Sequence, residues 1–140
     1  MSSLLDRQTA RRVADVMHPG LVSCPVWTPL RSVAELMARH RIHCVVVFDY
    51  GREGDEDRGL FGIVSDRDVA DAFAAGAIDD RTAGRTAATP LLTVYADDDL
   101  RRAAQVLAEH GTSHLVVLDR SSRRPVGILS TLDLAGALSA

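Results

Sequence analysis

Two short segments of this 140-residue chain carry the same potential binding chemistry. Gly62-Ile-Val-Ser65-Asp-Arg-Asp68 recurs as Gly127-Ile-Leu-Ser130-Thr-Leu-Asp133, which places a serine and then an aspartate after a glycine and two aliphatic residues. Each aspartate offers two carboxylate oxygens that can accept hydrogen bonds from the vicinal hydroxyls of a ribose. Each serine falls where a strand turns into a helix, and the free backbone N–H groups at a helix start favour an anion. The two segments therefore predict two related pockets, each suited to a ribose that bears phosphate.

The same spacing also fits a helix cap that needs no ligand. A serine followed three positions later by an acidic residue can form a reciprocal capping arrangement. Taken alone, the Ser-x-x-Asp pattern favours capping, and both interpretations stay open at this point. Arg67 in the first copy could clamp a phosphate with its planar guanidinium, or it could be a solvated helix residue. Its counterpart, Leu132, cannot hold a phosphate.

Further residues complete the predicted pockets. Gly62 and Gly127 have no side chain, so the backbone can approach a ligand closely. The strands around Val22-Ser23 and Leu92-Thr93 offer an apolar slot for a base, with backbone groups to read its edge.

The repeat extends over most of the chain and governs the predicted fold. Leu30 and His40 match Leu100 and His110, an offset of 70 positions (100 − 30), and the apolar runs 45–48 and 115–118 keep this offset. The glycine motifs are offset by 65 (127 − 62), so the first copy holds five extra residues. This insertion, within 50–58, is charged and rich in glycine, which predicts a long hairpin loop.

Each copy is predicted to run helix–strand–helix–strand–strand–helix. Thr28-Pro29 predicts the start of the second helix in the first copy. In the second copy Asp97 or Asp98 is the predicted cap, and Gly111 the stop. Strands without alternation, such as 44–48, are expected to be buried on both faces. The predicted bounds are 6–17, 21–24, 28–39, 44–48, 60–64 and 66–75 in the first copy, and 82–88, 91–95, 97–110, 114–118, 125–129 and 131–138 in the second.

Composition narrows the class of protein. A hydrophobic content of 46% and a net charge of −3 describe an ordinary globular chain without the basic stripe of a nucleic-acid-binding protein. The start lacks the apolar core of a signal peptide, and no apolar run reaches the length of a membrane span. Two cysteines, Cys24 and Cys44, are too few for a disulfide framework. These features predict a cytoplasmic protein that binds neither nucleic acid nor membrane. A zinc site at His40, His43 and Cys44 is disfavoured because these residues lie across a helix end and a strand start, which spreads their side chains apart.

The two copies of Gly-φ-φ-Ser-x-x-Asp, the apolar strands ending in Asp49 and Asp119, and the order of elements resemble a tandem pair of cystathionine beta-synthase (CBS) domains, a Bateman module. The resemblance covers almost the whole chain. It departs from the family where members often carry a proline, at Val46 and Val116. The resemblance implies an α/β (α+β) fold of two half-domains with pseudo-twofold symmetry, each a small mixed sheet packed with helices. The corresponding domains are 8–78 and 81–140.

The resemblance also implies a function. Such modules are regulatory and non-enzymatic, and bind AMP, ADP, ATP or S-adenosylmethionine in the cleft between the repeats; no cofactor is obligatory. The chain is expected to form a homodimer through its helices and to act on an effector protein. The alternative is a ligand-free interaction or scaffold protein, and an enzyme is a distant third because no nucleophile–base pairing can be identified. The expected ligand-binding residues are Gly62, Ser65, Arg67, Asp68, Gly127, Ser130, Asp133, Val22, Ser23, Leu92 and Thr93.

Overall fold

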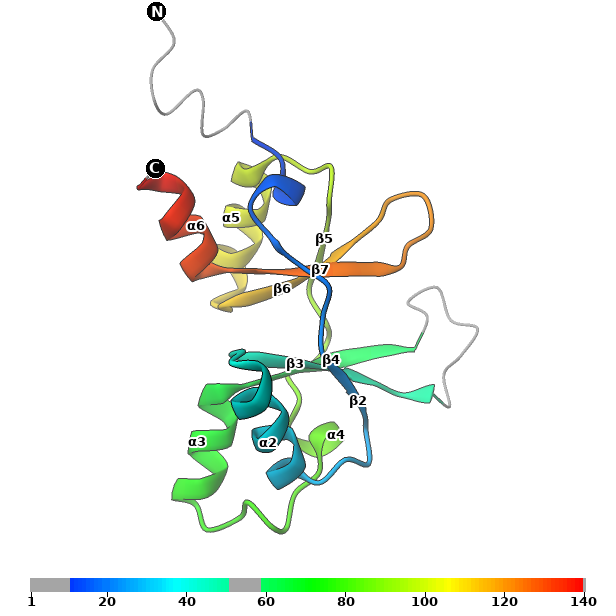
Figure 1. Cartoon of the computed structure of the whole chain (residues 1–140), viewed down its shortest axis with the longest axis vertical. Coiled ribbons are helices and arrows are strands. Elements are labelled where there is room, and N and C mark those ends of the chain that lie inside the picture. Colours follow the sequence, from blue (N-terminus) through cyan, green and yellow to red (C-terminus); the bar gives the residue numbers. More distant parts are fainter. Residues whose placement is uncertain (1–10, 51–58, 140) are drawn as a thin grey trace, which may run out of the picture. The chain divides into compact units, whose positions relative to one another are not determined.

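The protein folds into two compact units, which are described here from a computed structural model covering residues 11–50 and 59–139 (Figure 1). The inner unit is Val22–Leu91, and the outer unit joins residues 11–21 to residues 92–139. The predicted domains 8–78 and 81–140 therefore share most, but not all, of their residues with the compact units. Residues 11–21 pack with the second sequence repeat, and residues 81–91 pack with the first.

The inner unit is a three-stranded mixed sheet with helices. The strand order is β2-β3-β4, with β2 parallel and β4 antiparallel to the central strand β3. Figure 1 shows α2 and α3 beside each other, packed against this sheet. The elements are β2 (Ser23–Pro25), α2 (Leu30–His40), β3 (Cys44–Phe48), β4 (Leu60–Ser65), α3 (Asp66–Ala74) and α4 (Ala83–Thr86).

The outer unit repeats this arrangement and adds one strand. Its order is β1-β7-β6-β5, and β1 adds the N-terminal segment antiparallel to β7. The predicted fold class is confirmed, because both units combine a small mixed sheet with helices. The elements are the 3₁₀ turn η1 (Val13–Asp15), β1 (His18–Pro19), β5 (Thr93–Tyr95), α5 (Leu100–His110), β6 (His114–Leu118), β7 (Pro125–Ser130) and α6 (Thr131–Leu138).

Equivalent residues form the core of each unit. In α2 the buried residues Leu30, Val33 and Met37 follow a helical spacing, which puts one apolar stripe against the sheet. Helix α5 buries Leu100, Ala103 and Leu107 at the same positions. The central strands β3 and β6 are buried almost throughout, as their unbroken apolar runs predict. The repeat in the sequence is thus a repeat of two cores.

Several predicted helix bounds differ from the structure. The predicted helix 6–17 is wrong over its described residues, since only the short turn η1 forms there. Helix α2 has no side-chain cap from Thr28: it begins at Leu30, whose N–H donates to the carbonyl of Arg81 at 3.0 Å. This contact replaces the cap with a backbone bond from a distant segment. The predicted hairpin loop, apart from Tyr50, lies outside the described residues.

The start of α5 also differs from the prediction, while its end agrees. Asp99 is the cap, and its Oδ1 accepts a hydrogen bond from Arg102 N at 2.7 Å. Asp98 instead accepts from Tyr95 N at 2.8 Å, which ties the preceding turn to β5. Gly111 ends the helix in the left-handed conformation with φ 59°, as predicted.

The two units differ in the side chains that follow two equivalent strands. These strands are β2 and β3 in the inner unit and β5 and β6 in the outer unit. In the inner unit Trp27 and Tyr50 form an aromatic pair with ring centroids 6.2 Å apart. At an offset of 70 positions, the outer unit has Asp97 and Arg120, joined by a hydrogen bond of 2.9 Å between Asp97 Oδ1 and Arg120 Nε. The same place in the fold thus carries an aromatic contact in one unit and an ion pair in the other.

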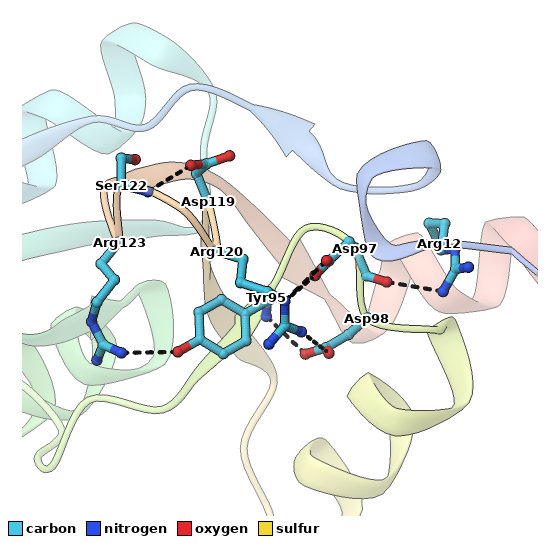
Figure 2. A network of polar contacts seen from close by, with 8 residues as sticks. All are labelled: Arg12, Tyr95, Asp97, Asp98, Asp119, Arg120, Ser122 and Arg123. Carbon is cyan, nitrogen blue, oxygen red and sulfur yellow. Dashed lines mark hydrogen bonds and ion pairs between the residues drawn. The ribbon is translucent and has the colours of Figure 1, made fainter.

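Figure 2 shows the polar network around this ion pair. The Arg120 Nη2 group also donates to Asp98 Oδ1 at 3.0 Å, and its guanidinium carbon lies 4.1 Å from the centre of the Tyr95 ring. At the end of the same ring, the Tyr95 hydroxyl accepts a hydrogen bond from Arg123 Nη1 at 3.0 Å. One tyrosine therefore joins two arginines from the turn between β6 and β7.

The network holds two carboxylates in their charged form. The hydrogen bond from Arg120 lowers the pKa of Asp97. Hydrogen bonds from Ser122, chiefly from its backbone N–H at 2.9 Å, lower the pKa of Asp119. A carboxyl whose pKa is lower in the folded state than in the unfolded state stabilises the fold above its unfolded pKa.

We expect acid to remove the contribution of Asp97. The wild type should be more stable than Asp97→Asn at pH 7, and the difference should shrink as the pH falls below the ordinary aspartate pKa of about 3.9 and through the lowered folded value. Urea unfolding at a series of pH values measures this difference. Asp80→Asn, at an exposed aspartate outside the network, is the control. A difference between wild type and Asp97→Asn that is independent of pH would contradict the expectation.

Candidate functional site

The first Ser-x-x-Asp motif lies where β4 leads into α3. The Ser65 hydroxyl accepts a hydrogen bond from Asp68 N at 3.2 Å, and Asp68 Oδ2 accepts from Ser65 N at 2.8 Å. This reciprocal arrangement is a capping box. It fixes the orientation of the aspartate at the end of the strand.

The second motif has the same geometry at the junction of β7 and α6. The Ser130 hydroxyl accepts from Asp133 N at 3.1 Å, and Asp133 Oδ2 accepts from Ser130 N at 2.8 Å. The capping interpretation is therefore correct for both motifs. It does not exclude a ligand, because the cap uses Oδ2 of each carboxylate and not Oδ1.

Both motif glycines are required by the packing of the chain. A Cβ atom added to Gly62 would lie 2.5 Å from the carbonyl oxygen of Ala88, and one added to Gly127 would lie 2.5 Å from that of His18. A Cβ atom cannot lie so close to a carbonyl oxygen. The absence of a side chain at each glycine therefore lets a neighbouring backbone segment approach the strand. The segments are equivalent, because 18 and 88 are 70 positions apart. The close approach seen at each glycine is thus to the protein itself.

The predicted base-slot residues lie at the same end of each sheet as the serines. In the inner unit Ser23 is aligned with Val46 across β2 and β3, and Ser65 is aligned with Cys44 across β3 and β4. The carbonyl of Val22 accepts from Val46 N at 3.0 Å. One strand, β3, therefore lies between the predicted slot and the predicted ribose acceptor.

The outer unit repeats this placement. Thr93 is aligned with Val116, Ser130 is aligned with His114, and the carbonyl of Leu92 accepts from Val116 N at 3.1 Å. Ser23 and Thr93 are both exposed, so their side chains are accessible. The structure thus gathers the predicted residues of each motif within one unit.

Arg67 lies apart from the motif that contains it. Its Nε donates to Asp71 Oδ1 at 3.1 Å, one turn further along α3, and its side chain is 82% exposed. Surface pairs of this kind contribute little to stability. The structure therefore shows Arg67 as a solvated helix residue that carries an ion pair.

His18 joins the site, although its role there is not predicted by the sequence. Its Nδ1 lies 2.9 Å from Asp133 Oδ1, and the side chains are 76% and 7% exposed. The two residues are 115 positions apart (133 − 18), and the contact depends on the pairing of β1 with β7. One signal for this contact is present in the sequence, because the segments around residues 18 and 88 are equivalent at an offset of 70. The contact also requires that each segment packs with the other repeat, which the structure shows.

Metal-binding side chains are not gathered in the described parts of the chain. No group of three or more histidine, cysteine, aspartate or glutamate residues there could hold a metal ion. His43 instead pairs with Asp66 at 2.8 Å. Burial raises the pKa of the Cys24 thiol, so this sulfur is protonated at neutral pH. Likewise, none of the helices within residues 11–50 and 59–139 has the length and apolar character needed to cross a bilayer.

The sequence matches the family model of the CBS domain twice, over residues 13–75 and 85–140. The chain belongs to the CBS domain family. A comparison with curated proteins gives no match.

Solved CBS structures share the fold. A CBS domain protein of Pyrobaculum aerophilum, PAE2072, complexed with AMP, is 27% identical with a TM-score of 0.75, over 93% of this chain and 100% of that one. The CBS domain pair of MJ0100, in complex with 5′-methylthioadenosine and S-adenosyl-L-methionine, is 20% identical with a TM-score of 0.77, over 92% and 96%. The CBS domain of a bacterial CNNM/CorC Mg²⁺ transporter, in complex with ATP, is 17% identical with a TM-score of 0.78, over 97% and 92%.

Proposed function

We propose that this protein is a regulatory module that senses an adenosine-derived nucleotide. The observation that carries the proposal is the pair of equivalent strand ends, at which a capping box holds an aspartate in place and leaves Oδ1 outside the cap. An aspartate held in this way is an acceptor prepared for a ribose diol, since little further ordering is needed on binding. The AMP complex of PAE2072 supports adenine nucleotides as the ligand class.

In this proposal each residue has a defined role. Asp68 and Asp133 accept the ribose hydroxyls, and Ser65 and Ser130 mark the helix starts whose N–H groups attract phosphate. The segments Val22-Ser23 and Leu92-Thr93 contact the base. Gly62 and Gly127 contribute indirectly, because they let the segments that hold Ala88 and His18 pass close to the strand that ends in each motif. Ligand binding then shifts the populations of the module's conformations, and an effector protein on another chain responds to this shift.

The alternative function is a ligand-free interaction protein, and the capping boxes favour it because they explain both serines and both aspartates. Calorimetric titration with AMP, ADP, ATP and S-adenosylmethionine distinguishes the two. We expect the titration of at least one of these ligands to give a heat of binding that saturates. The absence of binding by all four would support the ligand-free alternative. Chromatography of each nucleotide after prolonged incubation with the protein tests the proposal that the module has no catalytic activity. The expected result is unchanged nucleotide.

We also propose that the protein forms a homodimer through α3 and α6, the last helix of each repeat. Phe73 on α3 is 74% exposed and Leu138 on α6 is 58% exposed. The two residues occupy the same position in the repeat, 65 positions apart. Exposed apolar side chains of this size can become buried in an interface, and their recurrence at the equivalent position of the repeat supports the proposal. A second copy of the chain presents the same two side chains, as a symmetric interface requires.

The homodimer is tested by sedimentation. We expect wild-type protein to sediment with twice the chain mass of 15.1 kDa. The double variant Phe73→Ser/Leu138→Ser should sediment as a monomer, because it removes apolar area from the interface at two places. The matched control is Trp27→Ser, at another exposed aromatic residue that lies outside the helices. A monomeric wild type at tens of micromolar would contradict the proposal.

A further inference from the structure

The two candidate sites differ in how the aspartate is occupied. In the outer unit Asp133 Oδ2 accepts from Ser130 N, and Oδ1 lies 2.9 Å from His18 Nδ1. Asp133 therefore has a backbone donor at one oxygen and an imidazole nitrogen close to the other.

In the inner unit the second oxygen is not taken in this way. Asp68 Oδ2 accepts from Ser65 N, and within residues 11–50 and 59–139 no donor contacts Asp68 Oδ1. The position equivalent to His18 is Ala88, whose side chain has no donor. One histidine thus separates two otherwise equivalent sites.

The backbone places these two residues alike. His18 is paired with Ile128 in the ladder between β1 and β7, beside Gly127. Ala88 forms a bridge with Ile63 beside Gly62, with Ala88 N donating to the Ile63 carbonyl at 2.9 Å. Both carbonyls approach the motif glycine equally closely. The backbone of residue 88 therefore has the same position relative to Asp68 as the backbone of His18 has relative to Asp133.

We propose that His18 is a specificity-determining residue that competes with the ligand for Asp133. This inference rests on the proposed function. The imidazole lies beside Oδ1, the oxygen outside the cap, so a ribose diol that approaches this oxygen meets His18 in the outer unit but meets no such side chain in the inner one. The histidine side chain is 76% exposed, which lets it turn away into solvent. The inner unit is thus the stronger adenosyl site, and the outer unit binds when His18 is displaced.

Calorimetric titration with adenosine tests the competition one site at a time. In the Asp68→Ala background, which leaves the outer site intact, His18→Ala should tighten adenosine binding about two- to fivefold. The effect is modest because a pair with one largely exposed partner is weak. In the Asp133→Ala background, where only the inner site remains, His18→Ala should leave the affinity unchanged, since the competition needs Asp133.

The reciprocal variant is the matched control. In the Asp133→Ala background, Ala88→His places a histidine beside Asp68 and should weaken adenosine binding about two- to fivefold. Position 88 is exposed, so the larger side chain can be accommodated. Thermal unfolding of each variant checks that the fold is kept.

The outcomes separate this inference from the proposed function. Weaker binding in His18→Ala would overturn the inference, because it would make His18 a direct ligand contact. Unchanged affinity in both His18→Ala and Ala88→His would also overturn it, while leaving adenosine binding in place. If adenosine binds no variant and not the wild type, both the inference and the proposed nucleotide function fail.

Discussion

AMP at 100 times its dissociation constant should raise the melting temperature of this protein by about 5–11 °C. A ligand that binds only the folded state at this excess adds about 2.7 kcal/mol to the free energy of unfolding. A chain of 140 residues gains roughly 2–4 °C for each kcal/mol. Differential scanning fluorimetry over a series of AMP concentrations measures the shift, which should grow with the logarithm of concentration once the site is saturated.

A double variant serves as control for this shift. Asp68→Ala/Asp133→Ala removes both proposed ribose acceptors and should leave a shift much smaller than that of the wild type. The variant is less stable without ligand because it loses the hydrogen bonds from Ser65 N and Ser130 N to the two carboxylates, each worth about 0.5–1.5 kcal/mol. The comparison is therefore made between shifts and not between melting temperatures. Melting curves that stay flat with AMP, ADP, ATP and S-adenosylmethionine would contradict nucleotide sensing.

Asp68→Ala should weaken AMP binding by roughly five- to 150-fold. The substitution deletes the acceptor of the ribose hydroxyls and leaves buried ligand hydroxyls unpaired, at a cost of about 1–3 kcal/mol. Calorimetry at constant pH and salt measures the change. The substitution also removes one hydrogen bond of the capping box, from Ser65 N to Asp68 Oδ2. The control is therefore Asp99→Ala, which removes a side-chain hydrogen bond at the start of α5 but no proposed ligand contact. That control should lower stability and keep the affinity.

The same titration tests the asymmetry between the motifs. We propose that Arg67 leaves its weak surface pair with Asp71 and reaches the phosphate of a bound ligand. Arg67→Leu, which copies Leu132, should then weaken AMP binding and leave adenosine nearly unaffected. Asp133→Ala should affect phosphorylated ligands less than Asp68→Ala does. Equal losses for the two aspartates, with no effect of Arg67→Leu, would contradict the asymmetry and leave nucleotide binding intact.

Features that depend on local spacing could be predicted from the sequence alone. The apolar runs of β3 and β6, the helical stripes of α2 and α5 and the stop at Gly111 were all predicted. Each is set by residues a few positions apart, because helix and strand periods are short. The Ser-x-x-Asp cap belongs to the same class, since its hydrogen bonds join residues three positions apart. Repetition of these local patterns then predicted two similar sheets and, with them, the family.

Contacts between distant segments were decided only by the tertiary structure. The spacing of residues does not show that residues 11–21 complete the second repeat, or that the carbonyl of Arg81 caps α2. These bonds form because an unpaired strand edge and a free helix N–H each need a partner, and the chain supplies it from wherever packing brings a segment close. The contact between His18 and Asp133 arises in this way. The sequence determined two equivalent motifs, and the pairing of β1 with β7 decided that a histidine lies on only one of them.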